Sequence, residues 1–496
     1  MADVTTGTAG LADALRGALG AENVIEEQAE REYYSWDLSQ EPLQVAEIAV
    51  RPGTPEEAAE AVRLAHAAGV PVVPRGGGIS YTQGFEPAQA AAVLMDTKRL
   101  TGIEINAEDS YVVAGVGVTW EELYLACAGE MVRTPYFGPL SGRFATVGGT
   151  LAQNSLFYGS GLYGTAADVT TAVEVALADG KLLRTGSWAH RNGTPFSRYY
   201  GPDLTGLFLA DTGAMGVKTR AALKLIPLPL ANQAISFAFD TFEAAYAALA
   251  EMARLELAAE LFIFDPANHA IYRKLGFSFL EGVEWSLHAT VEGGEDAQVD
   301  AAVALLRGIA GRPGGGGREI DPSLPLAMRA DPFGGGLRGF VGSEGHVRLP
   351  VHGVFPLSRV VAAQRAVVEL IERRRDVIEQ HDLRITFLTA YSRGWVVFEP
   401  VVWWPDAIGP YRTRHAPAEM VAQFGSAPPN PEACAAGTGL RRELAQTFSA
   451  MGGIHLQVGK WYPLKESLDP GTFETLAALK GALDPRHLVN PGSLGL

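Results

Sequence analysis

The sequence predicts an α+β fold of two or three domains, in which short buried strands alternate with capped helices and an antiparallel sheet follows. Three observations predict it. Capped helices alternate with apolar runs over residues 54–130, a turn dipeptide interrupts alternating apolar positions at 169–185, and longer strand-helix units follow residue 230. Such alternation is typical of helices packed on mixed or antiparallel sheets. The 496 residues are long enough for several cores.

Two helices carry clear start signals. Thr54 is a good N-cap, Pro55 suits the first helical position and Glu57 can complete a capping box, while Gly69 is a stop signal. The spacing therefore predicts a helix over 54–69. A second capped helix is predicted from Thr119, which has a glutamate at its third helical position.

Apolar runs predict short strands at residues 70–74, 91–96 and 111–118. Residues 169–185 predict a β-hairpin, because apolar positions alternate up to Asp179-Gly180, a dipeptide favoured in two-residue turns. Pro227 and Pro229 then interrupt the chain, and the pattern changes. We interpret residues 230 to 450 as a separate domain of strand-helix units on an antiparallel sheet.

Composition narrows the class of protein. Lys and Arg total 40 against 56 Asp and Glu, so the formal charge is −16 and binding to nucleic acids or anionic membranes is not expected. The first 15 residues lack the pattern of a signal peptide, which predicts a cytoplasmic protein. Cys127 and Cys434 are too far apart in sequence for a paired zinc motif, and we predict no metal site.

Four glycine-rich segments are candidates for binding a phosphate and a planar ring. The first, PRGGGISYTQG at residues 74–84, follows a predicted strand, and glycines allow backbone N–H groups to surround an anion. Ile79, Ser80 and Tyr81 replace the Gly-Lys-Ser/Thr of a nucleotide P-loop, and the dinucleotide fingerprint also fails. The others are 138–164, 211–219 and the C-terminal LDPRHLVNPGSLGL.

Together, in this order, the four segments resemble the FAD-binding flavoproteins of the vanillyl alcohol oxidase and p-cresol methylhydroxylase (PCMH) type. The resemblance covers residues 45–228 and 440–496, and the middle matches only weakly. It implies a PCMH-type FAD-binding domain in two parts, residues 1–229 and 451–496. An α+β cap domain for the substrate, built on an antiparallel sheet, is inserted at residues 230–450.

The resemblance also implies which residues hold FAD. In the family, the first loop wraps the pyrophosphate, the second segment lines the flavin and ribityl chain, the third meets the adenine and the tail lies near the ring. The corresponding residues are Pro74, Arg75, Gly76, Gly77, Gly78, Ile79, Ser80 and Gly84; Pro139, Thr146, Gly148, Gly149, Ala152, Asn154, Gly159 and Gly164; Gly216 and Val217; and Asn490. Many relatives have a histidine linked to the flavin where this chain has Ile79, which implies non-covalent FAD.

Catalytic candidates lie in the expected cap and just before the tail. Flavin chemistry in this family oxidises a C–H bond by hydride transfer to flavin N5, and a protein group takes a proton. His455 is our first candidate for the base because its segment adjoins the tail, and Arg348 is a candidate anchor for a carboxylate or phenolate. Tyr391 and His352 complete the set, and Glu399 lies in the same segment as Tyr391.

The resemblance implies an FAD-dependent oxidoreductase acting on a small alcohol, hydroxy acid or aromatic alcohol, with dioxygen or an electron carrier as acceptor and a possible homodimer. One alternative is a 2-hydroxyacid dehydrogenase of the lactate or glycolate type that uses an electron carrier. Another is a catalytically silent flavin- or ligand-binding protein. The chain has Met451-Gly-Gly-Ile-His455 where the hydroxyacid branch has Glu-His-Gly-Ile-Gly, and Tyr163-Gly-Thr165 where the phenol oxidases have Tyr-Gly-Asp. The substrate class stays open.

Overall fold

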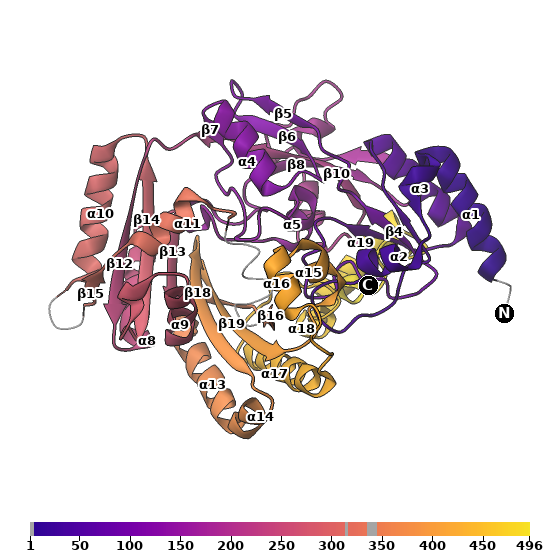
Figure 1. Ribbon diagram of the computed structural model, residues 1–496. Coiled ribbons are helices and arrows are strands. Elements are labelled where there is room, and N and C mark those ends of the chain that lie inside the picture. The colour runs from indigo at the N-terminus through magenta and orange to yellow at the C-terminus, as the bar shows by residue number, and fades with distance from the viewer. Residues whose placement is uncertain (1–3, 313–315, 335–344) are drawn as a thin grey trace.

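A computed structural model describes residues 4–312, 316–334 and 345–496 (Figure 1). In Figure 1 the first part of the chain, in indigo and magenta, lies beside the yellow C-terminal segment, and the strands of the middle of the chain form a separate large sheet. The fold combines helices with parallel and antiparallel sheets, and the predicted α+β class is confirmed. None of the helices in these three described stretches is long and apolar enough to cross a bilayer.

The first sheet carries the strand that leads into the first glycine loop. Its order is β1 (Val24–Ile25), β2 (Ile48–Val50), β4 (Val93–Asp96) and β3 (Val72–Arg75), and all pairs except β1–β2 are parallel. Helices α1 (Val4–Leu19) and α3 (Pro55–Ala68) pack against each other and share an apolar core with this sheet. Helix α2 (Gln28–Ser35) lies between β1 and β2 in sequence.

The second sheet is antiparallel and carries the other glycine-rich segments. Its order is β5 (Ile103–Asn106), β6 (Tyr111–Gly115), β10 (Val217–Lys224), β8 (Thr170–Ala176) and β9 (Leu182–Arg184). A two-strand ladder joins β7 (Val132–Arg133) to β11 (Ile226–Pro227). The helices of this region are α4 (Trp120–Gly129), α5 (Val147–Gln153), α6 (Ser160–Tyr163) and α7 (Leu204–Leu207).

The third sheet, here called the cap sheet, has eight antiparallel strands. The order is β15 (Arg318–Ile320), β12 (Ala231–Phe239), β14 (Trp285–Gly293), β13 (Glu260–Phe264), β18 (Arg384–Ser392), β19 (Trp395–Pro405) and β16 (His346–Pro350), and β17 (Gly353–Pro356) also pairs with β19. Its helices are α8 (Phe242–Ala253), α9 (Pro266–Lys274), α10 (Asp296–Ala310), α11 (Ser323–Ala330), α13 (Val360–Arg373), α14 (Arg375–Gln380), α15 (Gly409–His415), α16 (Ala418–Phe424) and α17 (Pro431–Ala450). The antiparallel sheet predicted after residue 230 is confirmed.

The local signals gave the right elements with two differences in detail. Helix α3 begins after Thr54, whose hydroxyl accepts the Glu57 N–H (3.1 Å), and it ends at Gly69 with φ 76°. The Glu57 carboxylate, however, accepts the N–H of Gly53 and not that of Thr54, so the capping box is incomplete. The hairpin β8–β9 forms, but Leu177 pairs with Lys181, so the turn has three residues and not two.

The C-terminal segment returns to the first sheet. Helices α18 (Leu464–Ser467) and α19 (Pro470–Leu483) precede a bridge between Val489 and Val72 of β3. The buried ammonium of Lys480 donates to the carbonyls of Ala214 (2.7 Å) and Val489 (2.8 Å) and pairs with Asp484. The strands of the cap sheet lie between residues 231 and 405, whereas the exact domain boundaries at 229/230 and 450/451 stay predictions.

Candidate active site

A cavity lies between the glycine-rich segments and the cap sheet. Its wall on one side comes from residues 74–85, 139–157 and 212–218, and on the other from β16, β18, β19 and the segment around Leu456. Fourteen of the predicted FAD-binding residues line it: Pro74, Arg75, Gly76, Gly77, Gly78, Ile79, Ser80, Gly84, Pro139, Thr146, Gly148, Gly149, Ala152 and Gly216. The catalytic candidates Arg348 and His352 line it as well.

The first glycine loop presents unpaired backbone donors. Among the described residues, no acceptor is found for the N–H groups of Gly76, Gly77, Gly78 and Ile79. Gly77 and Gly78 are buried, and buried backbone N–H groups are rarely left without an acceptor, so this run of donors indicates a site completed by a ligand. Successive N–H groups of this kind form a concave anion site, and these residues therefore fit the expected pyrophosphate of FAD.

The glycines of this loop serve a purpose that the sequence did not suggest. A Cβ atom on Gly76 would lie 2.4 Å from Oγ1 of Thr146, and one on Gly77 would lie 2.0 Å from the carbonyl oxygen of Phe144. The missing side chains thus allow two loops to pack against each other, and the expectation that they leave room for the phosphate itself was incomplete. Thr146 is the N-cap of α5 and its hydroxyl accepts the N–H of Gly149 (3.3 Å).

Two buried cations in this wall differ in their pairing. Lys218 pairs with the buried carboxylate of Asp211. Arg75 has a completely buried side chain whose closest carboxylate, Asp96, is 3.9 Å from Nη1, and its Nε and Nη2 atoms have no hydrogen-bond partner among the described residues. Because buried donors without an acceptor are costly, the Nε and Nη2 atoms of Arg75 suit this residue to an anionic ligand in this cavity.

Across the cavity, the His352 imidazole lies between a phenol and a carboxylate. Its Nε2 is 3.0 Å from the Tyr81 hydroxyl and 3.1 Å from Oε2 of Glu399, and its Nδ1 is 3.2 Å from the carbonyl oxygen of Leu456. The Leu456 carbonyl only accepts, so Nδ1 donates to it. The Glu399 carboxylate also only accepts, so Nε2 donates to Glu399 when the ring carries both hydrogens and accepts from Tyr81 when the ring is neutral. Nε2 is therefore the atom that can take up a proton, facing Glu399.

Tyr81 supplies the donor to that nitrogen. Burial, with the Glu399 carboxylate as the second cause, raises the pKa of Tyr81 well above its ordinary value. The phenol therefore keeps its proton at neutral pH and donates to Nε2 of His352. From the sequence, Tyr81 counts only as a mismatch to nucleotide loops, and its position beside the glycine loop is the signal that could have identified it.

The rest of the cap-side wall is largely apolar, with one partly exposed cation, Arg348. Leu388 of β18, Val397 of β19 and Leu456 line the cavity. The guanidinium of Arg348 also lines it and lies 5.3 Å from the ring centre of Trp403, and no carboxylate of the described chain is within ion-pair distance of it. An apolar chamber with one unpaired guanidinium suits a small substrate that carries a negative charge.

Five of the predicted FAD-binding residues do not line the cavity: Asn154, Gly159, Gly164, Val217 and Asn490. The buried Asn490 amide donates to the carbonyls of Gly84 (2.9 Å) and Thr212 (2.7 Å), and its oxygen accepts from Lys460. It thus joins two loops that themselves border the cavity. Oδ1 of Asn154 accepts the N–H of Ala167 (3.2 Å), so this residue fixes the end of α5.

Two catalytic candidates also lie outside the cavity lining. The Tyr391 hydroxyl accepts the N–H of Gly394 in the β18–β19 turn (2.9 Å). The His455 ring stacks on Tyr462 (4.1 Å between ring centres), and its Nδ1 donates to the carbonyl of His352 (2.7 Å). Its Nε2 accepts from the hydroxyl of Ser449 (2.9 Å), so both ring nitrogens already have partners.

The burial of His455 predicts a loss of stability in acid. Burial lowers its pKa from 6.5 to about 4. As the pH falls from 6.5 towards 4, this histidine is protonated first in the unfolded chain. The free energy of unfolding therefore falls by up to about 3 kcal/mol over this window. Denaturation at a series of pH values should show that the free energy of unfolding depends less steeply on pH in His455→Gln than in the native chain. Equal slopes would contradict the buried, neutral state of this imidazole.

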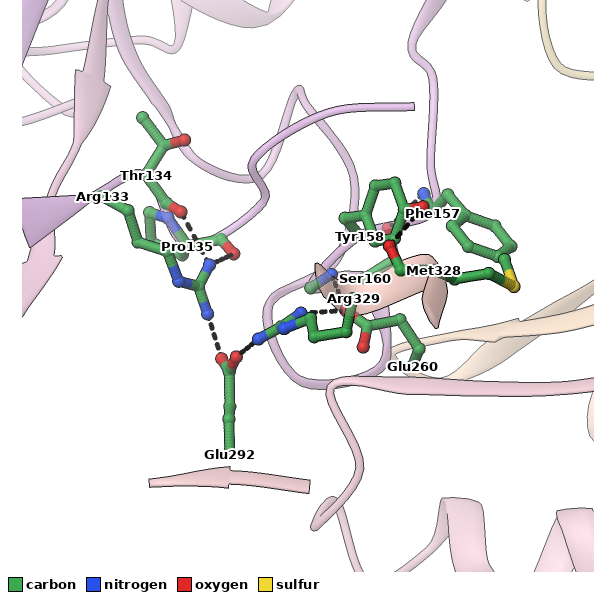
Figure 2. A network of polar contacts seen from close by, with 11 residues as sticks. Arg133, Thr134, Pro135, Phe157, Tyr158, Ser160, Glu260, Glu292, Met328 and Arg329 are labelled. Atoms are coloured by element: carbon green, nitrogen blue, oxygen red, sulfur yellow. Dashed lines mark hydrogen bonds and ion pairs between the residues drawn. The ribbon is translucent and has the colours of Figure 1, made fainter. Parts of the chain in front are cut away.

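A buried network of charges holds the cavity wall against the cap sheet (Figure 2). Arg133, which precedes the wall segment, pairs with Glu292 of β14 and donates to the carbonyls of Thr134 and Pro135. Arg329 of α11 bridges Glu292 and Glu260. Glu260 also accepts the N–H of Gly159 (2.8 Å), two residues after the wall residue Phe157.

A hydrogen bond gives a second link between the cavity-wall segment and helix α11 of the cap. The Tyr158 hydroxyl donates to the carbonyl of Met328 in α11 (3.2 Å), as drawn in Figure 2. The neighbouring Phe157 lines the cavity, and its N–H donates to the Ser160 hydroxyl (2.9 Å). The charge network therefore fixes the position of Phe157 relative to the cap sheet.

Comparison with known proteins agrees with this geometry. A family model described as an FAD binding domain matches residues 46–186, and one described as the C-terminal domain of FAD linked oxidases matches residues 459–494. The two matches include the four unpaired N–H groups of the first loop, and also Lys460 and Asn490 of the tail.

Relatives and solved structures extend the match over the chain. The chain is 27% identical to glycolate oxidase subunit GlcD of Bacillus subtilis over 52% of its own length and 54% of that protein, so the match spans about half of this relative. A Danio rerio protein described as a probable mitochondrial D-lactate dehydrogenase is 24% identical over 97% of this chain and 90% of its own. The structure of p-cresol methylhydroxylase with substrate bound superposes with a TM-score of 0.79 at 20% identity, covering 99% and 97% of the two chains.

Proposed function

The chain belongs to the FAD-linked oxidases and dehydrogenases with a PCMH-type FAD-binding domain, and from this we propose that it oxidises a C–H bond of a small alcohol or hydroxy acid. The observation that carries the proposal is one cavity in which unpaired N–H groups of the glycine loop face the same space as His352 and Arg348. Bound FAD would supply the hydride acceptor.

The residues of the first loop and Arg75 are the proposed contacts of the FAD pyrophosphate. The unpaired N–H groups of residues 76–79 and the unpaired guanidinium nitrogens of Arg75 support this role. The helix α5 segment and Gly216 are the proposed walls around the remainder of the cofactor. Ile79 has no nucleophilic atom, which supports non-covalent binding.

His352 is the proposed base. Its Nε2 accepts the proton of the substrate hydroxyl as the C–H bond breaks, and the substrate becomes a carbonyl compound. The Glu399 carboxylate at 3.1 Å stabilises the imidazolium that results, and the Leu456 carbonyl fixes the orientation of the ring. Tyr81, which donates to the same nitrogen, must turn its hydroxyl to the substrate or be displaced when the substrate hydroxyl binds.

A hydroxy acid is the substrate class that we favour. An alcohol needs a base and an apolar chamber only, whereas Arg348 offers a cation without a carboxylate partner in the described chain. Guanidinium groups bind carboxylates in a bidentate manner, and this would direct the carbon next to the carboxylate toward the cavity. The names of the Bacillus and Danio relatives, a glycolate oxidase subunit and a D-lactate dehydrogenase, support the same class.

The test begins with the absorption spectrum of the purified protein before and after acid precipitation. We expect flavin bands, and we expect the yellow colour to stay in the supernatant because Ile79 has no nucleophilic atom that could bind FAD covalently. Anaerobic mixing with small 2-hydroxy acids should then bleach the flavin faster than mixing with the matching alcohols.

Other outcomes separate the alternatives. Equal bleaching by alcohols and hydroxy acids would remove Arg348 from substrate selection and leave general alcohol oxidation. Colour without bleaching by either panel would favour a silent flavin-binding protein. Reoxidation of the bleached protein by dissolved dioxygen, compared with an artificial electron carrier, distinguishes an oxidase from a dehydrogenase.

A further inference from the structure

Helix α15 follows the cap sheet in sequence, yet it lies against the first glycine loop. The hydroxyl of Tyr411 in this helix donates to the carbonyl of Gly77 (2.8 Å), and its ring edge would be 2.8 Å from a Cβ atom on Gly78. Tyr411 is buried, and burial raises the pKa of its phenol, which therefore remains a donor. A residue outside both parts of the expected FAD-binding domain thus touches the predicted pyrophosphate loop.

This hydrogen bond determines which way one peptide group faces. The peptide bonds of the described chain are trans, so the C=O of Gly77 and the N–H of Gly78 point in opposite directions. Because Tyr411 holds the carbonyl on the α15 side, the Gly78 N–H points away from α15. Gly77 and Gly78 both line the cavity, and this N–H is among the four without an acceptor.

The contact of α15 with the N-terminal part is anchored at several points. The Tyr33 ring of α2 is parallel to that of Tyr411 (6.1 Å between ring centres), and its hydroxyl is 2.8 Å from Nε2 of His415. The guanidinium of Arg414 lies over the Tyr33 ring, 3.7 Å from its centre, and pairs with Glu30. The helix is therefore held in place from outside the glycine loop.

Aromatic rings that include Tyr33 surround Arg75, the guanidinium of the cavity wall whose Nε and Nη2 lack hydrogen-bond partners among the described residues. Arg75 lies 5.0 Å from the ring centre of Tyr33, 5.1 Å from that of Tyr34 and 5.3 Å from that of Phe85. Cation–π contacts of this kind hold a guanidinium without neutralising its charge. Tyr33 thus contacts Arg75 and also the α15 residues Tyr411 and Arg414.

We propose that helix α15, through Tyr411, is part of the cofactor site: it orients the Gly77–Gly78 peptide so that its N–H faces the FAD pyrophosphate, and it thereby slows FAD release. Tyr411 is a positioning residue in this proposal, since it acts through the loop and not on FAD itself. The proposal depends on the FAD site and is independent of the substrate and of the catalytic base.

Tyr411→Phe is the variant that tests it, because it removes one hydroxyl and keeps the ring. We expect FAD to leave this variant about two- to tenfold faster than the native protein, the range for one net hydrogen bond. FAD release is followed by the rise in flavin fluorescence after dilution, with the thermal unfolding of the apoprotein measured in parallel.

Tyr246→Phe is the matched control. Tyr246 is also a buried tyrosine of the cap, and its hydroxyl donates to the carbonyl of Leu357 (2.7 Å), away from the cavity. FAD release from this variant should match the native rate even where its unfolding temperature falls. An unchanged release rate in Tyr411→Phe, or an equal increase in both variants, would overturn the proposal; absence of FAD from the native protein would instead refute the cofactor assignment.

Discussion

Glu292→Gln is expected to lower the free energy of unfolding by about 3–5 kcal/mol. Glu292 is buried and pairs with two guanidinium groups, that of the buried Arg133 and that of the partly buried Arg329 (Figure 2). The amide keeps the size of the side chain but removes its charge, so two cations remain in a site with one fewer anion. Thermal and urea denaturation of the native and variant proteins measure the loss.

An exposed ion pair provides the control. Glu243 pairs with Arg365 and both side chains are largely exposed, so Glu243→Gln should cost no more than about 1 kcal/mol. The double variant Glu292→Gln with Arg133→Gln should recover part of the lost stability, because Arg133 loses its carboxylate partner in the single variant whereas Arg329 keeps Glu260. Similar losses in the Glu292 and Glu243 variants would show that the buried network contributes little.

His352→Gln is expected to reduce the rate of flavin reduction about 10²- to 10⁴-fold, the usual contribution of a general base. Glutamine cannot take up the proton that Nε2 of His352 accepts beside Glu399. FAD binding should be unchanged, because His352 lies on the cap side of the cavity. Anaerobic stopped-flow measurements with an active hydroxy acid give the rate, and a titration with FAD gives the affinity.

His455→Gln is the matched variant for this experiment. Its ring nitrogens are both engaged, by the His352 carbonyl and the Ser449 hydroxyl, and it does not line the cavity. Its rate of flavin reduction should stay within a few-fold of the native rate. The opposite pattern, with a large loss for His455→Gln and a small one for His352→Gln, would restore our first sequence-based candidate for the base.

The parts of the fold that could be predicted depend on neighbours in sequence. Thr54, Pro55 and Gly69 define α3 because a helix cap is made within a few residues. Such local signals could not predict the order of strands in the cap sheet. β13, for example, pairs with β18, more than a hundred residues later in the chain, and long-range pairing of this kind leaves no local pattern.

The candidate site likewise has parts that a local stretch of sequence predicts and parts that only the fold brings together. The glycine loop was predicted from one short stretch, since the role proposed for it depends on adjacent backbone N–H groups. Tyr81 and His352, by contrast, are 271 positions apart, and only the folded chain brings them within hydrogen-bond distance. Asn490 shows a further limit, because the resemblance identified its position whereas its contacts are with the carbonyls of two loops.

The bridge between Val72 and Val489 also has a consequence for biosynthesis. The strand that leads into the first glycine loop makes backbone hydrogen bonds with residues 488 and 490, which are synthesised long after it. The cap sheet is contiguous in sequence and can form earlier, because its strands lie between residues 231 and 405. The strand before the first glycine loop can therefore complete these hydrogen bonds only after residues 488–490 have been made.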